Sequence, residues 1–126
     1  MYNASFYPTP PEVAEKMLAK VGKLYERSIL EPSAGKGDLA DAAVGKLDRY
    51  YNRCREVVHC IEIEPELQAA IRGKGYPLVG TDFLTFWPDE KYDLILMNPP
   101  FANGDAHLLH AWEILDHGDI VCLLNE

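Results

Sequence analysis

The sequence has few cysteines and no long apolar segment, and each absence excludes a class of protein. Its three cysteines, Cys54, Cys60 and Cys122, form no Cys-x-x-Cys pair and leave an odd count, which argues against a thiolate metal site and a disulfide framework. No apolar stretch approaches the roughly 20 residues that cross a membrane. No charged and then apolar leader opens the chain. We therefore expect a cytoplasmic protein with no membrane partner.

Positive charge is also scarce. The 126 residues include 12 Lys and Arg against 20 Asp and Glu, which gives a net charge of −8. Residues 1–60 hold 9 basic and 8 acidic side chains, whereas residues 61–126 hold 3 and 12. A protein that grips nucleic acid by its phosphates normally has a basic face. We therefore expect either that a part absent from this sequence holds a polyanion, or that the substrate is not a polyanion.

Short apolar segments alternate with segments of helical periodicity along the whole chain. The apolar segments predict strands at 28–30, 57–63, 77–80, 92–97 and 119–124. The periodic segments predict helices at 11–23, 38–51, 65–73 and 105–117, the last two closed by Gly73 and Gly118. Strands that are apolar at nearly every position and separated by helices indicate a parallel sheet covered on both faces. The sequence therefore predicts one α/β domain over residues 1–126, with a Rossmann-like, doubly wound, mostly parallel sheet of about five strands.

The most informative motif is Asn98-Pro99-Pro100-Phe101, directly after the apolar segment 92–97. Two prolines fix the φ angle near −65° and remove two backbone donors, so we expect this stretch neither to extend the sheet nor to begin a helix. An amide side chain, a bare carbonyl and a flat ring remain. The two oxygens can hold a planar amino group by accepting hydrogen bonds from its N–H groups, while the ring stacks on the base that carries it. The alternative is a strand that simply ends in a proline-rich turn, and we favour the functional interpretation.

A glycine-containing loop, Glu31-Pro32-Ser33-Ala34-Gly35-Lys36-Gly37-Asp38, follows the first strand. Its small residues allow a sharp turn that brings a ligand close to main-chain N–H groups at a helix start. It has neither the Gly-Lys-Ser/Thr of a phosphate loop nor the Gly-x-Gly-x-x-Gly of dinucleotide sites. Many such turns need glycine for geometry alone. Glu31 favours a ligand-binding role for this loop, because a carboxylate at the strand end suits a ligand with a cationic end.

Acidic residues also follow the second and third predicted strands. Glu62 and Glu64 bracket Ile63, and Glu62 lies 25 residues after Gly37, near the spacing at which nucleotide sites place a carboxylate on ribose hydroxyls. The alternative, that these glutamates merely enter solvent, is equally consistent with the pattern alone. In Thr81-Asp82-Phe83-Leu84, the acid could accept a hydrogen bond from an adenine amino group while the ring packs on the base.

The order of these motifs resembles the S-adenosylmethionine-dependent methyltransferases, specifically the γ class of enzymes that modify adenine N6 in DNA. The segment Phe6-Tyr7-Pro8-Thr9-Pro10-Pro11 is similar to the N-terminal motif of that class, which contacts the methionine portion of the cofactor. The resemblance implies S-adenosylmethionine as cofactor. The cofactor-binding residues that it implies are Tyr7, Thr9, Pro10, Glu31, Ser33, Ala34, Gly35, Gly37, Glu62, Ile63, Asp82, Phe83 and Asn98.

The resemblance also implies a mechanism for Asn98, Pro99, Pro100 and Phe101. The Asn98 side-chain oxygen and the Pro99 carbonyl would accept hydrogen bonds from the target amino group and aim its lone pair at the sulfonium methyl. Transfer would be a direct displacement that depends on positioning and electrostatics. Phe101 would stack on a flipped base. DNA is the partner that the resemblance favours, with RNA as an alternative.

The chain departs from this family after its fifth predicted strand. The family continues with a helix, an antiparallel hairpin and a basic recognition region, so we expect a truncated domain whose recognition domain or partner subunit is missing. The unfinished sheet would leave 120–124 as an edge strand open to self-association. Alternatives are amino methylation of an RNA base or of a protein glutamine, and a cofactor-binding subunit that is inactive without a partner.

Two histidines, His107 and His110, lie three residues apart on one predicted helix face, a spacing that can bind metal. No cysteine or carboxylate cluster accompanies them in a fitting pattern. We therefore expect no metal site, and interpret Asp105 and His107 as the entry and first turn of a helix.

Overall fold

The computed structural model describes residues 8–48 and 54–123. Its strands are β1 (Ile29–Glu31), β2 (Val58–Ile61), β3 (Leu78–Gly80), β4 (Tyr92–Met97) and β5 (Leu115–Cys122). Its α-helices are α1 (Pro11–Ala19), α2 (Asp38–Leu47), α3 (Pro65–Gly73) and α4 (Gly104–Glu113). Short 3-10 helices occur at η1 (Cys54–Val57), η2 (Phe83–Thr85) and η3 (Phe101–Asn103). The expectation that no helix begins in the Asn-Pro-Pro-Phe stretch is wrong, because Pro100 directly precedes the first residue of η3.

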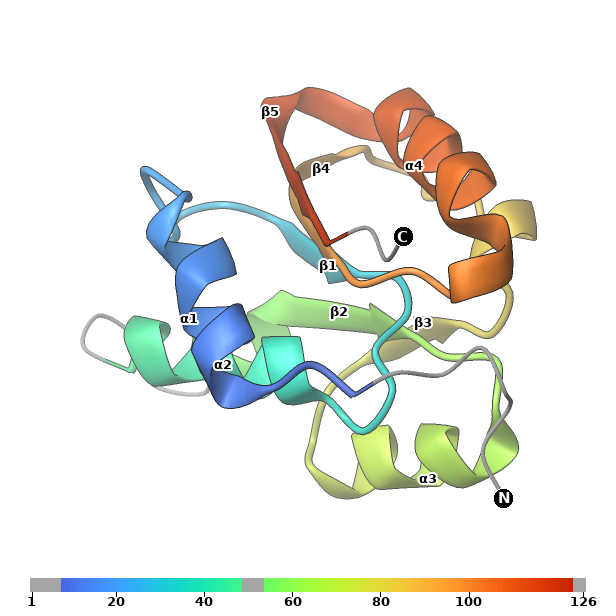
Figure 1. Ribbon diagram of the computed structural model, residues 1–126, viewed down its shortest axis with the longest axis horizontal. Coiled ribbons are helices and arrows are strands. Elements are labelled where there is room, and N and C mark those ends of the chain that lie inside the picture. Colours follow the sequence, from blue (N-terminus) through green and yellow to red (C-terminus); the bar gives the residue numbers. More distant parts are fainter. Residues whose placement is uncertain (1–7, 49–53, 124–126) are drawn as a thin grey trace.

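The five strands form one sheet in the order β3-β2-β1-β4-β5, and every neighbouring pair is parallel. The chain therefore winds outward from β1 in one direction to β3 and then crosses back to β4 on the other side of β1 (Figure 1). This reversal creates a crevice at the carboxyl ends of β1 and β4, where open α/β sheets bind their ligands. The predicted doubly wound parallel fold is confirmed.

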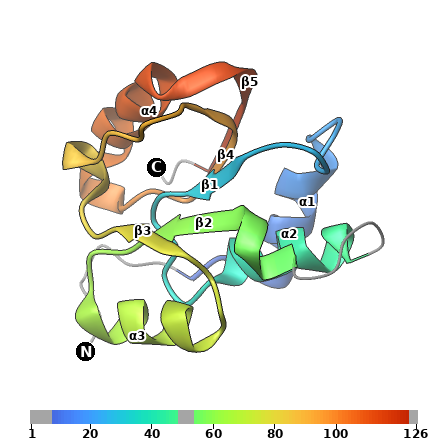
Figure 2. The same ribbon diagram turned by 180° about the vertical axis from the view of Figure 1, so that it is seen from behind.

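Helices cover both faces of the sheet, and each face has its own apolar cluster. Helices α1 and α2 pack over the first face, and the second face is covered by α4 and η2 (Figures 1 and 2). Alternate residues of the central strands supply the two clusters: Leu94 and Leu96 belong to the first, Ile95 and Met97 to the second, and all four are fully buried. This two-sided burial explains why β4 is apolar along most of its length.

Proline and glycine determine several element boundaries. Helices α1 and α3 begin at Pro11 and Pro65, where the fixed φ of proline suits the first helical position. Helix α2 is preceded by Gly37, which has a φ of 96°. A Cβ atom at Gly37 would lie 3.3 Å from Cδ1 of Ile71. Both the backbone angle and the close packing therefore favour glycine at this position.

The predicted boundary between the last helix and the last strand is wrong. Helix α4 ends at Glu113 rather than His117, and β5 begins at Leu115 rather than Asp119. Gly118 does not close a helix but lies within β5, where an added Cβ would overlap the carbonyl of Asp93. The β4–β5 register shifts between Tyr92 and Leu94. The helical periodicity of 105–117 therefore led to a wrong prediction for residues 115–117, which belong to the irregular first part of β5.

Three other predicted elements are shorter in the structure. Helix α1 ends at Ala19, four residues before its predicted end at Lys23, and α2 ends at Leu47, beyond which residues 49–53 lie outside the described part. Strand β2 covers only Val58–Ile61, because η1 precedes it and Glu62 turns away into a loop. Among the described residues, none of the helices has the length and apolar character needed to cross a membrane.

Candidate functional site

A cavity of about 270 Å³ lies at the carboxyl ends of the strands, next to the crevice between β1 and β4. It is lined by Pro32, Ser33, Glu62, Ile63, Glu64, Thr81, Asp82, Phe83, Leu84, Asn98, Pro100, Asn103 and His107. Residues from four separate sequence motifs therefore meet here: the loop after β1, the acids after β2, the Asp-Phe pair after β3 and the Asn-Pro-Pro motif after β4.

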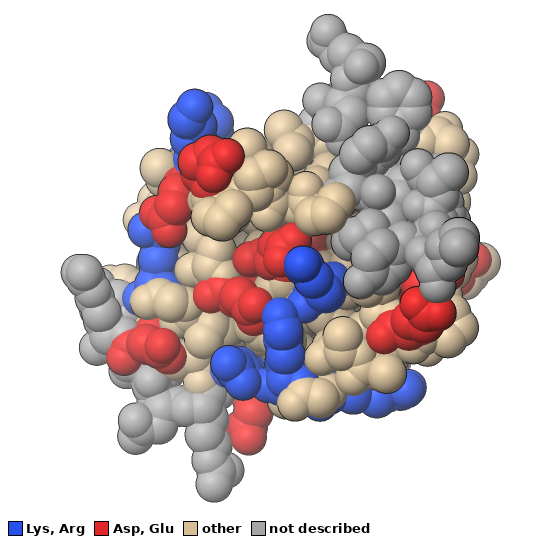
Figure 3. Space-filling view, turned by 60° about the horizontal axis from the view of Figure 1, so that its bottom comes forward, with Lys and Arg blue, Asp and Glu red and all other residues tan. Residues whose placement is uncertain are grey.

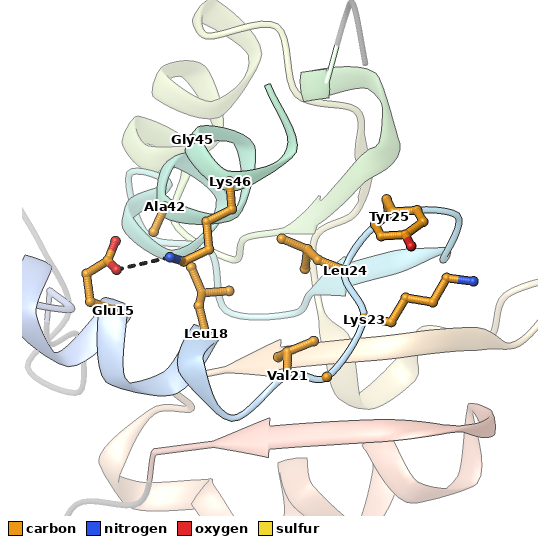
Figure 4. Close-up of a pocket in the computed structure, with 10 residues that line it drawn as sticks. Glu15, Leu18, Val21, Lys23, Leu24, Tyr25, Ala42, Gly45 and Lys46 are labelled. Atoms are coloured by element: carbon orange, nitrogen blue, oxygen red, sulfur yellow. Dashed lines mark ion pairs between the residues drawn. The ribbon is translucent and has the colours of Figure 1, made fainter. Parts of the chain in front are cut away.

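A wider hollow of about 540 Å³ lies elsewhere, between α1, the loop that follows it and α2 (Figure 4). Its polar side chains include the exposed pair Glu15 and Lys46, whose charged atoms are 3.2 Å apart. Leu18, Val21 and Leu24 form its apolar wall. This hollow gathers none of the motif residues and no buried polar group, so the cavity at the strand ends is the better candidate.

Glu31 ends β1 and is the most unusual carboxyl group of the described residues. It is only 1% exposed, and among the described residues its Oε2 atom has no hydrogen-bond partner. Burial raises the pKa of Glu31 well above its ordinary value, and the negative charges of Glu62 and Asp38 raise it further. A buried carboxyl oxygen without a donor costs free energy unless a ligand supplies one. Glu31 is not among the residues that line the cavity, and its role toward the cationic end of a ligand stays a prediction.

Glu62 holds two loops of the site together. Its Oε1 accepts a hydrogen bond from Gly35 N–H at 2.7 Å, and its Oε2 accepts one from Glu64 N–H at 2.7 Å. Burial raises the pKa of Glu62 above its ordinary value, although the two backbone hydrogen bonds act in the opposite direction and lower it. A carboxylate has about four acceptor sites, so ribose hydroxyls can still donate to it. The role of Glu62 in binding ribose stays a prediction. The structure shows a further role, in which Glu62 holds the glycine loop in place through Gly35.

The loop after β3 brings Asp82 and Phe83 to the cavity in different ways. Asp82 precedes η2, and its Oδ1 accepts from Leu84 N–H at 3.1 Å. Phe83 is 2% exposed and packs against the rings of His107 and His110, at centroid distances of 5.6 and 4.8 Å. The more exposed apolar side chains that line the cavity are Ile63 and Leu84. Of these two, Leu84 had not been predicted as a site residue.

Asn98 follows β4 and lines the cavity, although it is only 8% exposed. Its Nδ2 donates to Oγ1 of Thr9 at 3.0 Å, across 89 residues of sequence. The backbone N–H of Thr9 in turn donates to Oδ2 of Asp38, at the start of α2, at 3.1 Å. The N-terminal motif, the glycine loop and the Asn-Pro-Pro motif are therefore joined through hydrogen bonds.

The remaining predicted residues are distributed as follows. Ser33 lines the cavity, while Ala34, Gly35 and Gly37 are buried in the loop behind it. Pro10 is exposed directly before α1. Pro100 lines the cavity and Pro99 is buried beside it. Tyr7 and the side chain of Phe101 lie outside the described residues.

His107 and Asn103 are cavity residues that the sequence did not assign to the site. His107 Nδ1 lies 2.8 Å from the carbonyl oxygen of Asn103, and His110 Nε2 lies 2.7 Å from that of Phe86. A ring nitrogen that faces a carbonyl must carry its proton and is not available to a metal. Burial also lowers the pKa of His107, which favours the neutral ring. Within 8–48 and 54–123, no group of three or more His, Cys, Asp or Glu could hold a metal ion.

No protein-family model matches the sequence. A curated relative, the type II methyltransferase M.CvrRI of Paramecium bursaria Chlorella virus XZ-6E, is 26% identical over 116 residues, which cover 91% of this chain and 29% of the viral protein. The chain thus spans less than a third of that relative's length.

Solved structures share the fold. PH1948 of Pyrococcus horikoshii, a proposed RNA methyltransferase, is 25% identical with a TM-score of 0.68, over 87% of this chain and 56% of that one. The glycopeptide N-methyltransferase MtfA in complex with S-adenosyl-L-methionine is 19% identical with a TM-score of 0.65, over 94% of this chain and 56% of that one. The chain therefore has the fold of the class I S-adenosylmethionine-dependent methyltransferases.

Proposed function

We propose that the chain is the cofactor-binding and catalytic part of an S-adenosylmethionine-dependent methyltransferase that modifies adenine N6 in DNA. The observation that carries this proposal is the position of Asn98. It follows β4 at the crevice beside β1, lines the cavity, and has its side-chain nitrogen bound to Thr9. An amide oxygen and a proline carbonyl at this place can accept hydrogen bonds from the two N–H groups of an exocyclic amine.

S-Adenosylmethionine is the cofactor that the site fits. It supplies an electrophilic methyl group on a positively charged sulfur. The Oε2 atom of Glu31, which has no partner among residues 8–48 and 54–123, would accept a hydrogen bond from the ammonium of the methionine portion, and Glu62 has acceptor capacity left for the ribose hydroxyls. Asp82 and the apolar side chains of Ile63 and Leu84 form the part of the cavity that suits an adenine ring. MtfA, with the same fold, is known in a complex with this cofactor.

Asn98 and Pro99 would position the amino group of the target base. Their oxygens would accept hydrogen bonds from the target amine, which orients the nitrogen lone pair and increases its electron density. Both groups are held by the rigid sheet end and by the fixed φ angles of Pro99 and Pro100. Such preorganised acceptors lower the barrier because no reorganisation is needed during the reaction.

DNA is the proposed substrate for two reasons. The viral relative is described as a type II methyltransferase, and the Thr9-Pro10 motif together with Phe101 resembles the DNA enzymes. The face shown in Figure 3 has basic side chains beside acidic ones rather than a continuous basic patch. We therefore propose that a recognition domain or partner subunit outside this sequence supplies the phosphate contacts. RNA is the second candidate, since PH1948 is a proposed RNA methyltransferase.

The test is transfer of labelled methyl groups to unmethylated genomic DNA and to total RNA, each digested to nucleosides. Label in N6-methyldeoxyadenosine supports the proposal, and label in RNA alone moves the substrate to RNA. The variant Asn98→Ala serves as the control for contaminating activity. Absence of transfer to both nucleic acids would overturn the proposed function.

A further inference from the structure

We infer that Thr9 is a positioning residue for Asn98, so that its hydroxyl orients the amide that receives the target amine. This inference rests on the proposed function and deepens it. The resemblance had implied a different role, in which Thr9 contacts the cofactor.

The geometry of the contact supports an orienting role. Asn98 Nδ2 donates to Thr9 Oγ1 at 3.0 Å, and Thr9 and Asn98 are only 7% and 8% exposed. A side-chain amide is planar, so fixing its nitrogen branch also determines where its oxygen lies. With the nitrogen on Thr9, the oxygen occupies the other branch. A flipped amide would present its N–H groups to an amine that needs an acceptor.

Thr9 is itself held at a defined place. Its backbone N–H donates to Oδ2 of Asp38 at 3.1 Å, and Asp38 is the first residue of α2, directly after Gly37 of the glycine loop. On the other side of Thr9, Pro10 precedes α1 and Pro11 begins it, and both prolines restrict the backbone. The loop proposed for the cofactor and the amide proposed for the target therefore share one support.

The hydroxyl can be removed with little change of shape. Thr9→Val replaces it by a methyl group, and Thr9→Ser keeps it. A displacement of about 1 Å in a reacting group can cost about a hundredfold in rate. We expect Thr9→Val to lower kcat by about 10- to 100-fold, while the dissociation constant of S-adenosylmethionine, measured by calorimetry, stays within about twofold. Thr9→Ser should recover most of kcat.

Ser28→Ala is the matched control. Ser28 Oγ accepts a hydrogen bond from Asp93 N–H at 2.9 Å, and Ser28 precedes β1, at the opposite end of the strand from the residues that line the cavity. The Ser28→Ala variant loses a hydroxyl hydrogen bond of similar length. Because Ser28 does not line the cavity, kcat should stay unchanged. A Thr9→Val protein with weaker cofactor binding and unchanged kcat at saturation would overturn the inference and restore the cofactor role. Unchanged values of both constants would also overturn it.

A second measurement does not depend on transfer activity. In nitrogen-15 NMR spectra of the cofactor-free protein, the side-chain amide of Asn98 should give protons protected from exchange, and Thr9→Val should remove that protection. Loss of protection supports the contact even if no substrate is methylated, which separates this inference from the proposed function. Equal protection in wild type and Thr9→Val would refute it.

Discussion

Replacing Glu31 with glutamine tests the cofactor site most directly, because it changes a charge and almost nothing in shape. In the cofactor-free protein, the Glu31 carboxyl group is buried, lacks a partner for Oε2 among the described residues, and faces the charges of Glu62 and Asp38. Its pKa is raised, chiefly by burial. The ionised form of Glu31 is thus destabilised in the free protein. A cation that pairs with the carboxylate would stabilise that form.

The pH dependence of stability has a definite sign. Between its ordinary pKa and its raised folded pKa, Glu31 holds a proton in the folded state that the unfolded state releases. The free energy of unfolding should therefore fall as the pH rises through this window, by up to about 1.4 kcal/mol per pH unit from this group. Glu31→Gln does not titrate. The free energy of unfolding of the Glu31→Gln variant should therefore increase relative to that of wild type as the pH rises.

Cofactor binding should change in the opposite direction. Glutamine cannot pair with an ammonium as a carboxylate does, and hydrogen bonds to charged groups contribute about 1.5–3 kcal/mol. The dissociation constant of S-adenosylmethionine should then rise about 10- to 150-fold. Wild-type affinity should also improve as the pH rises through the titration of Glu31, and Glu31→Gln should lose the part of this pH dependence that Glu31 supplies.

Urea denaturation between pH 5 and pH 9 and calorimetry in buffers of different ionisation enthalpy would measure both effects. Glu15→Gln is the control, since Glu15 pairs with Lys46 at an exposed site, where ion pairs contribute little. If Glu31→Gln bound the cofactor as tightly as wild type and released the same number of protons on binding, the assignment of Glu31 to the ammonium would be refuted.

Three further predictions concern separate parts of the site. Asn98→Ala should abolish methyl transfer in the labelling assay and leave the calorimetric affinity for the cofactor nearly unchanged; weaker cofactor binding would contradict its place on the target side. Glu62→Ala should weaken cofactor binding by about 1–3 kcal/mol and lower the free energy of unfolding by a similar amount, because two backbone N–H groups lose their acceptor; an unchanged affinity would exclude Glu62 from the ribose. Gly37→Ala should destabilise the fold by about 1–3 kcal/mol in urea, since its φ is 96°. Gly45→Ala, in α2 with no atom within 4 Å of an added Cβ, should instead be neutral or stabilising, and equal effects at the two glycines would contradict this reasoning.

Much of the architecture could be predicted because it depends on patterns that are local in sequence. The apolar segment 92–97 coincides with β4, and the Pro65–Gly73 helix has the predicted bounds. The failure at 105–117 has a physical reason. Helical periodicity continues through Leu115, but pairing of Leu115 with Tyr92 and the approach of Gly118 to Asp93 favour a strand there. Those partners lie more than 20 residues away and are invisible to a local pattern.

The sequence by itself determined which chemical groups the site contains. The carboxylates, the glycine loop and the Asn-Pro-Pro motif each follow a strand, and parallel strands must end at the same edge of the sheet. Only the tertiary structure decided how these groups are used. It left Glu31 without a partner for Oε2 among the described residues, gave Glu62 the amides of Gly35 and Glu64, and joined Thr9 to Asn98 across 89 residues. Hydrogen bonds of this kind depend on distances in space, which no spacing along the chain records.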